Sequence, residues 1–345
     1  MDKQAVITRL STLDLSRYPY FEIKELIREL GIVGLIKFTL HPGKIITRAR
    51  CDGNLKKVSD LSYKPQQFNK TCQRASTPIN TMFYGCIVPE EQSLQDTLYI
   101  SAVESSSLIR GGTETSGSET ITYGKWEVTK DINLLIIVHK DCFKDVQNSL
   151  LEELKSTYDN FLESCPDLAA DIDIFSKYFA GEFSKKNESG ADYNYLISAI
   201  LTEVVTTEHN FDGVMYPSVQ AGGKYGFNVA ITPKSVDTKM KLVLAYETHL
   251  IKNRDLVYIG GKSRGGTILR KRLLNYILCI RFFIEVHSIV SASRFFHMPT
   301  YLRVVIECQS RFFPFFPAFS RNCPDYFLHT SGSSSFRSLS DLGAR

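Results

Sequence analysis

The chain has 345 residues, and its hydrophobic fraction of 43% and charged fraction of 23% are close to the averages for globular proteins. This length supplies a core without disulfide staples, which excludes small stapled peptides, while the composition argues against wholly disordered, collagenous and membrane-embedded chains. The net charge of +4 conceals an asymmetry, because residues 252–345 carry 14 Lys and Arg against 5 Asp and Glu and hold half of the 22 Phe residues. We therefore expect a boundary near Lys252.

The first part of the chain predicts one clear helix and several short strands. Apolar residues at helical spacing predict an amphipathic helix over 21–31, which Gly31 ends. The alternation in IITRAR predicts a strand over 45–50 that places Arg48 and Arg50 on one face. A polar loop follows over 52–80, and then a strand at 81–84 that Gly85 stops.

The middle of the chain is less regular. Residues 98–109 fit either a strand or the start of a helix, and the stretch rich in Gly, Ser and Thr at 111–120 predicts a loop. Two short strands are expected at 125–128 and 134–138, and helical spacing predicts three helices between 146 and 207.

A tight turn at Asp212-Gly213, a glycine loop at 222–226 and two strands at 214–216 and 228–231 follow these helices. Strands and helices that follow one another in this order indicate an α+β fold.

Residues 251–345 form a basic, Phe-rich extension of uncertain order. Its apolar segment 273–290 has the length of a short membrane span, but Arg281, Glu285 and His287 interrupt it, and a central charge costs about 2.5–3.5 kcal/mol. Membrane insertion is therefore disfavoured. Arg beside aromatic residues can contact nucleic acid, yet we favour an extension without a function of its own. The N-terminus lacks the apolar segment of a secretory signal, so we expect a cytoplasmic protein.

Common cofactor and metal motifs fail on inspection. The tripeptide at 261–263, Gly-Lys-Ser, lacks the earlier glycine of a phosphate loop, since position 256 is Leu. The eight cysteines form no C-x-x-C pair and have no histidine at zinc-finger spacing. No dinucleotide, zinc-protease, hydrolase or calcium motif is present. We therefore expect no metal.

One segment is more specific. The residues FDGVMYPS at 211–218, followed by GGKYGFNVAIT, resemble the end of the RES-domain family, which is named for an Arg, a Glu and a Ser. Three earlier segments continue the resemblance in the same order: HPGKIITRAR at 41–50, RASTPINTMFYG at 74–85 and YLISAILTEVV at 195–205. The match covers about residues 41–245. We therefore divide the chain into an N-terminal helical segment (1–40), a RES-like NAD-binding domain (41–250) and the extension (251–345).

The resemblance implies a fold, a substrate and a site. The fold is an ADP-ribosyltransferase-like split β-sheet with flanking helices, the substrate is NAD, and several such proteins are toxins held in check by an antitoxin. Arg48, Glu104 and Ser218 match the three residues of the family name, although Glu90 or Glu91 remain alternatives to Glu104. Arg74, Tyr84 and Asn228 are implied as further NAD-binding residues.

These residue types suit cleavage of the bond between ribose and nicotinamide. The ring leaves as a neutral molecule, so the main need is a carboxylate, here Glu104, that stabilises the oxocarbenium-like ribose. Arg48 can clamp pyrophosphate oxygens bidentately and Tyr84 can stack on nicotinamide. Ser218 and Asn228 can hydrogen-bond the phosphate or the ribose. Water or inorganic phosphate completes the reaction, without a metal.

Two alternatives stay open at this point. One is a catalytically inactive RES-like module that binds a nucleotide or a protein. The other is an ADP-ribosyltransferase that modifies a macromolecule, which differs only in the nucleophile that reaches the ribose.

Overall fold

The computed structural model describes residues 2–31, 36–53, 55–87, 94–111, 114–143, 149–185, 190–218, 226–254 and 256–259. The predicted boundary at 250/251 falls inside a strand, and the described fold continues as far as Ile259. The remainder of the extension lies outside the described residues, including the apolar segment 273–290. None of the described helices combines the length and apolar composition that a bilayer crossing requires.

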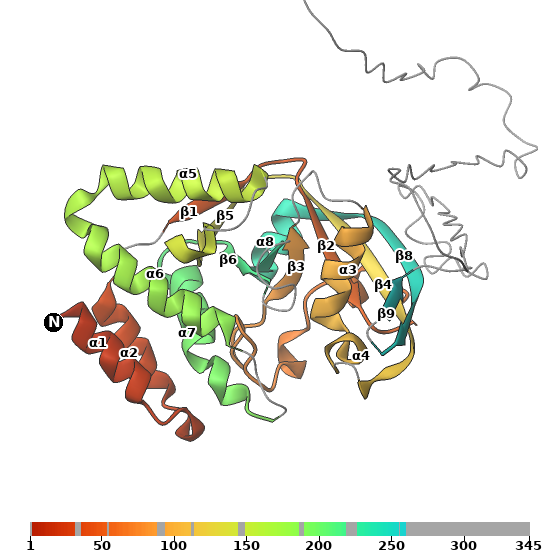
Figure 1. The fold of residues 1–345 in the computed structure, drawn as a ribbon, viewed down its shortest axis with the longest axis horizontal. Helices are drawn as coiled ribbons and strands as arrows, with labels where there is room; N and C mark the ends of the chain where they lie inside the picture. The colour runs from red at the N-terminus through yellow and green to blue at the C-terminus, as the bar shows by residue number, and fades with distance from the viewer. Residues whose placement is uncertain are drawn as a thin grey trace, which may run out of the picture. The chain divides into compact units, whose positions relative to one another are not determined.

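The fold is mixed α+β and is built on a nine-stranded, mostly antiparallel sheet (Figure 1). The strand order in the sheet is β1-β5-β6-β7-β3-β2-β4-β8-β9, and only β5 and β6 pair in parallel. The strands are β1 (Lys37–Leu40), β2 (Ile45–Arg50), β3 (Phe83–Ile87), β4 (Ser116–Val128), β5 (Ile132–Ile136), β6 (Gly213–Pro217), β7 (Phe227–Ile231), β8 (Met240–Asn253) and β9 (Leu256–Ile259).

Helices cover both faces of this sheet, as Figure 1 shows. The described α-helices are α1 (Lys3–Thr12), α2 (Tyr20–Leu30), α3 (Leu94–Ser105), α4 (Ser107–Arg110), α5 (Ser149–Ser164), α6 (Ala169–Ser184), α7 (Leu196–Glu208) and α8 (Pro233–Lys239). The three helices predicted between 146 and 207 are α5, α6 and α7. The predicted helix over 21–31 is α2, and Gly31 ends it with a φ of 67°.

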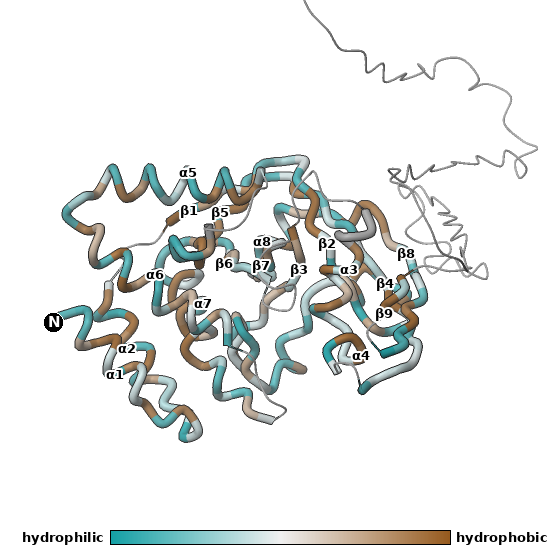
Figure 2. Tube along the Cα trace, in the orientation of Figure 1, coloured by the Kyte–Doolittle hydropathy of each residue, from teal (hydrophilic) through white to brown (hydrophobic). Residues whose placement is uncertain are grey.

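Two hydrophobic layers lie on opposite faces of the sheet. In β6, the side chains of Val214 and Tyr216 join one layer with α1, α2, α6 and α7, while Met215 joins the other layer with α5. The alternation follows from the two-residue period of a strand. Helix α5 alternates between hydrophobic and hydrophilic residues along its length, so it buries only its inner side (Figure 2). A smaller cluster packs α3 against β4, β8 and β9.

The sheet has a split between β2 and β3. These strands pair at one position only, Thr47 with Cys86, whereas β2 pairs with β4 along its whole length from Ile45 to Arg50. Two halves of the sheet, β1-β5-β6-β7-β3 and β2-β4-β8-β9, therefore meet at a single residue pair. Arg48 directly follows Thr47 and stands where β2 and β3 separate.

Two local predictions need correction, and one that was left open is decided. The strand predicted at 81–84 begins at Phe83 and continues through Gly85 to Ile87. Gly85 does not stop this strand. An added Cβ at this position would overlap the Ile46 side chain, so the glycine permits the close approach of β2 to β3. The predicted loop over 111–120 contains the start of β4 at Ser116, since pairing with the long β8 outweighs weak local propensity. Residues 98–109, left open as strand or helix, are helical except for Ser106, the extended residue that separates α3 from α4.

Candidate functional site

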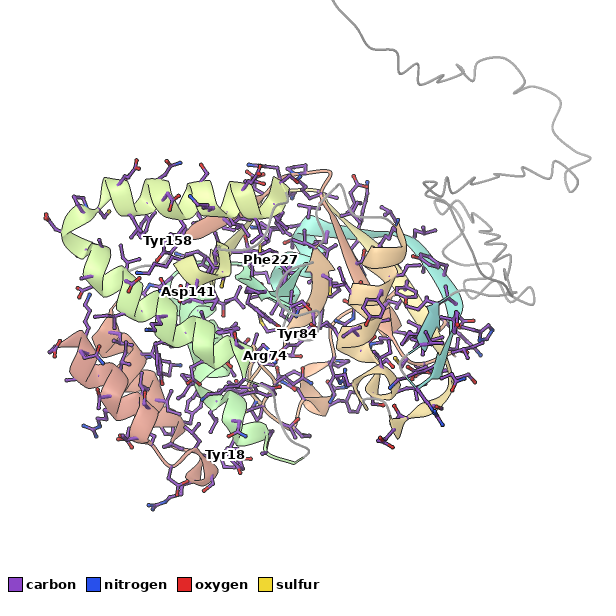
Figure 3. The ribbon with its side chains drawn as sticks, in the orientation of Figure 1. Tyr18, Arg74, Tyr84, Asp141, Tyr158 and Phe227 are labelled. Atoms are coloured by element: carbon purple, nitrogen blue, oxygen red, sulfur yellow. The ribbon has the colours of Figure 1, made fainter. Side chains whose placement is uncertain are left out.

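A cavity of about 710 Å³ opens where β2 and β3 separate. Its walls come from β2, β3, one face of α3, the end of α4, the loop before β3, the turn before α7, and strands β6 and β7. Figure 3 marks two of its residues, Arg74 and Tyr84, which lie close together. The volume lies in the range of about 300–1,000 Å³ that is usual for small-molecule sites.

Helix α3 supplies a fixed carboxylate to this cavity. Ser101, Glu104 and Ser105 have the i, i+3, i+4 spacing of one helix face, and all three line the cavity. Glu104 Oε1 accepts a hydrogen bond from Ser218 Oγ and another, of 3.0 Å, from Asn228 Nδ2. Two neutral donors from the ends of β6 and β7 therefore hold the carboxylate without neutralising its charge.

Arg48 brings a cation to the same cavity. Its Nη1 donates to the Tyr84 carbonyl across the split, and the guanidinium carbon lies 5.0 Å from the centre of the Phe83 ring. Among the described residues Arg48 forms no ion pair, and its buried Nε has no hydrogen-bond partner. Burial lowers the pKa of Arg48 to about 9, with a further contribution from the charge of Arg50. The guanidinium stays protonated at neutral pH and is available to an anion.

Arg74 is held by the other wall. Its Nη1 donates to the Phe183 carbonyl, Nη2 lies 3.4 Å from the Tyr195 hydroxyl, and the guanidinium carbon lies 4.9 Å from the centre of the Tyr195 ring. The ring of Tyr216 is also near, with its centre 6.0 Å away. The wall therefore presents a second cation together with two aromatic rings.

The hydroxyl of Tyr84 fixes the loop that carries Arg74. It accepts a 3.1 Å hydrogen bond from the Ala75 amide and lies 2.7 Å from Ser76 Oγ. Burial raises the pKa of Tyr84 to about 12, so the phenol is neutral at physiological pH. Because the hydroxyl is already hydrogen-bonded to this loop, the ring is the part of Tyr84 that can contact a ligand.

The structure brings the six candidate residues of the sequence analysis to one place. Five of them line the cavity: Arg48, Arg74, Tyr84, Glu104 and Asn228. The sixth, Ser218, is buried and contacts the site by its hydrogen bond to Glu104. The alternatives Glu90 and Glu91 lie outside the described residues.

Sequence reasoning missed several cavity residues: Cys86, Arg110, Tyr195 and Tyr216. Cys86 follows Tyr84 by two residues in a strand, so the period of two places it on the same face and was a usable signal. Tyr216 lies inside the DGVMYPS segment itself. Arg110 has no such signal, because it reaches the cavity only after α3 and α4 have packed.

Comparisons with known proteins add no assignment. The sequence matches no protein-family model and shows no significant similarity to a curated protein. The resemblance to the RES-domain family therefore depends on the segments quoted above. Within the described residues, no three His, Cys, Asp or Glu side chains gather as a metal ion would require.

The arrangement can bind an anionic ligand. Arg48, Arg74 and Arg110 line the cavity, and none of them pairs with a carboxylate among the described residues. One carboxylate, Glu104, lies among these cations and can face a positive charge in the ligand. Aromatic rings supply stacking surfaces.

Proposed function

We propose that the protein consumes NAD by cleaving the bond between nicotinamide and ribose, through hydrolysis or phosphorolysis. The observation that carries the proposal is that Glu104 and the guanidinium of Arg48, which forms no ion pair among the described residues, line one cavity. In NAD a cationic ring and an anionic pyrophosphate are joined in one molecule. The two protein charges are complementary to these two ligand charges.

The reaction needs little proton transfer at the scissile bond. The electron pair of that bond moves to the ring nitrogen, which leaves as neutral nicotinamide, while positive charge develops on the ribose. Glu104, fixed by Ser218 and Asn228, stabilises that charge, since a preorganised carboxylate costs no reorganisation when the charge appears. Water or inorganic phosphate then attacks the ribose carbon.

Arg48 and the aromatic wall bind the rest of the ligand. Arg48 lines the cavity and supplies a cation for the pyrophosphate, and its low-polarity surroundings strengthen this interaction relative to one in water. Arg74 supplies a second phosphate contact, and Tyr84 offers a ring on which nicotinamide can stack. The split between β2 and β3 supports the further proposal that the fold is ADP-ribosyltransferase-like.

The test is nicotinamide release from NAD by the full chain, measured by chromatography in buffers with and without inorganic phosphate. Glu104→Gln keeps the shape of the side chain and removes its charge, so kcat should fall about 10²–10³-fold while thermal unfolding stays close to wild type. An unchanged rate would remove Glu104 from the mechanism.

Product analysis separates the remaining alternatives. Free ADP-ribose indicates hydrolysis and its phosphorylated form indicates phosphorolysis, whereas label from NAD on a protein or nucleic acid indicates ADP-ribosyl transfer. Tight NAD binding by a folded chain without any release would overturn the enzyme and support the inactive binding module.

A further inference from the structure

A chain of hydrogen bonds in the wall of the cavity begins at Cys86. Cys86 Sγ lies 3.2 Å from Asn228 Oδ1, and Asn228 Nδ2 lies 3.0 Å from Glu104 Oε1. Cys86 and Asn228 are directly paired residues of β3 and β7, so the sheet register itself holds the thiol against the amide. Both side chains are almost fully buried, at 5% and 7% exposed.

The chemistry of the three groups allows one orientation of the amide. An ionised carboxylate only accepts hydrogen bonds, so it requires the NH₂ end of Asn228. The other end of the amide is then a carbonyl oxygen, which requires a donor. Burial and the charge of Glu104 raise the pKa of the Cys86 thiol above its ordinary value, so the sulfur keeps its proton at neutral pH and can donate.

We propose that Cys86 is a positioning residue for the cleavage of NAD: its S–H holds the Asn228 amide in the orientation that donates to Glu104. This inference rests on the function proposed above. Without the thiol, the amide oxygen loses the donor that it has among the described residues, so Asn228 is held at Glu104 by one hydrogen bond alone and can rotate away from it. Glu104 would then lose one of the two donors that fix it, while the cations that bind the pyrophosphate stay unchanged.

Kinetics distinguish this role from simple packing. Cys86→Ala in the full chain should lower kcat about tenfold, the size expected for one disturbed hydrogen bond to a charged group, and leave the KM for NAD within about twofold. Cys86→Ser, which restores a donor at the same position, should recover most of kcat. Cys72→Ala is the matched control, because Cys72 is buried to 4% exposure and does not line the cavity.

A second measurement does not depend on turnover. The side-chain NH₂ signals of Asn228, identified by their loss in Asn228→Asp, are followed by ¹H–¹⁵N NMR of the full chain without NAD. They should move in Cys86→Ala, return toward wild type in Cys86→Ser and stay in place in Cys72→Ala.

Signals that stay in place in Cys86→Ala would overturn the positioning role, as would equal loss of kcat in the Ser and Ala variants. A wild-type chain without turnover would instead overturn the proposed function, and the amide signals would still test the orientation of Asn228.

Discussion

Arg48 is a cation that the fold keeps largely out of water and that forms no ion pair among the described residues. Desolvation of an unpaired charge is unfavourable, and the lowered pKa of Arg48 expresses that cost. A purely structural role would be served better by a neutral side chain of similar volume. The arrangement is understandable if an anionic ligand supplies the missing charge.

Arg48→Lys tests the shape of this cation. A lysine keeps the charge but loses the planar set of donors, so NAD affinity should fall roughly 10- to 100-fold, the equivalent of about 1.5–3 kcal/mol for charged hydrogen bonds. Isothermal titration calorimetry measures the change. Arg50→Lys is the control, because Arg50 shares the strand but does not line the cavity. Equal affinities for wild type and Arg48→Lys would rule out the bidentate clamp.

At the scale of elements, Glu203 ties the N-terminal helices to the loop of the site. This buried residue of α7 accepts hydrogen bonds from Tyr20 and, at 2.9 Å, from Lys24, both of α2. Its other oxygen accepts a 2.8 Å hydrogen bond from Thr77, in the loop that carries Arg74. One carboxylate therefore joins three segments that are far apart in sequence.

Glu203→Ala should destabilise the fold by roughly 2–4 kcal/mol, because it leaves Tyr20 and Thr77 without this acceptor and Lys24 with only its longer, 3.9 Å pair to Glu208. This loss of stability is smaller than that expected for a fully buried pair, since Lys24 is partly exposed. Urea unfolding measures the change. Glu22→Ala is the control, because Glu22 forms an exposed pair with Arg9 and should change stability by less than about 1 kcal/mol. Similar losses in both variants would contradict the linking role of Glu203.

Gly85 sets the approach of β2 to β3. Gly85→Ala places a Cβ against the Ile46 side chain and 3.3 Å from the Thr47 carbonyl, so overpacking should cost about 1–3 kcal/mol and displace the neighbouring Arg48. Gly181→Ala in α6 is the counterpart, since nothing lies within 4 Å of the added carbon, and it should stabilise by up to about 1 kcal/mol. Thermal unfolding of both variants decides: equal effects would mean that the approach at Gly85 is not tight.

These elements also show what the sequence could and could not predict. The helices α2 and α5–α7 and the strand β2 are visible because apolar periodicity is local information. The continuation of β3 past Gly85 and the start of β4 at Ser116 depend on partners far along the chain, which local patterns do not contain. The order of the strands and the split between β2 and β3 are equally non-local.

The residues of the candidate site likewise fall into those that the sequence could predict and those that it could not. Arg48, Glu104, Ser218 and Asn228 were selected through resemblance of short segments. The contribution of Arg110 and Tyr195 depends on how helices pack around the split, which no local pattern records. Cys86 could have been predicted, because residues two apart in a strand, such as Tyr84 and Cys86, share a face.

At the scale of the whole molecule, the hairpin of β8 and β9 forms one edge of the sheet. Leu250 of β8 is fully buried and pairs with Ile259 of β9. Between them, Lys252 is 4% exposed, and its Nζ donates to the Leu108 carbonyl at 2.8 Å and to Thr115 Oγ1 at 2.5 Å. The hairpin thus closes the small cluster that holds α3, the helix of Glu104.

Two truncated chains test this role. Residues 1–259 should unfold cooperatively, whereas residues 1–250 should be less stable than this fragment by at least about 3 kcal/mol, because Ile259 and the contacts of Lys252 are removed. Differential scanning calorimetry compares them. Equal stability of the two fragments would show that the hairpin contributes nothing to the fold.

The spread of the site along the chain has a consequence for protein synthesis. Arg48 is among the first site residues to be translated and Asn228 is the last, and β7, which carries Asn228, lies between β6 and β3 in the sheet. A nascent chain whose β7 has not left the ribosome therefore holds no complete site, and a chain that stops before β7 lacks Asn228. The cleavage of NAD proposed above would in this way be withheld until most of the sheet has been made.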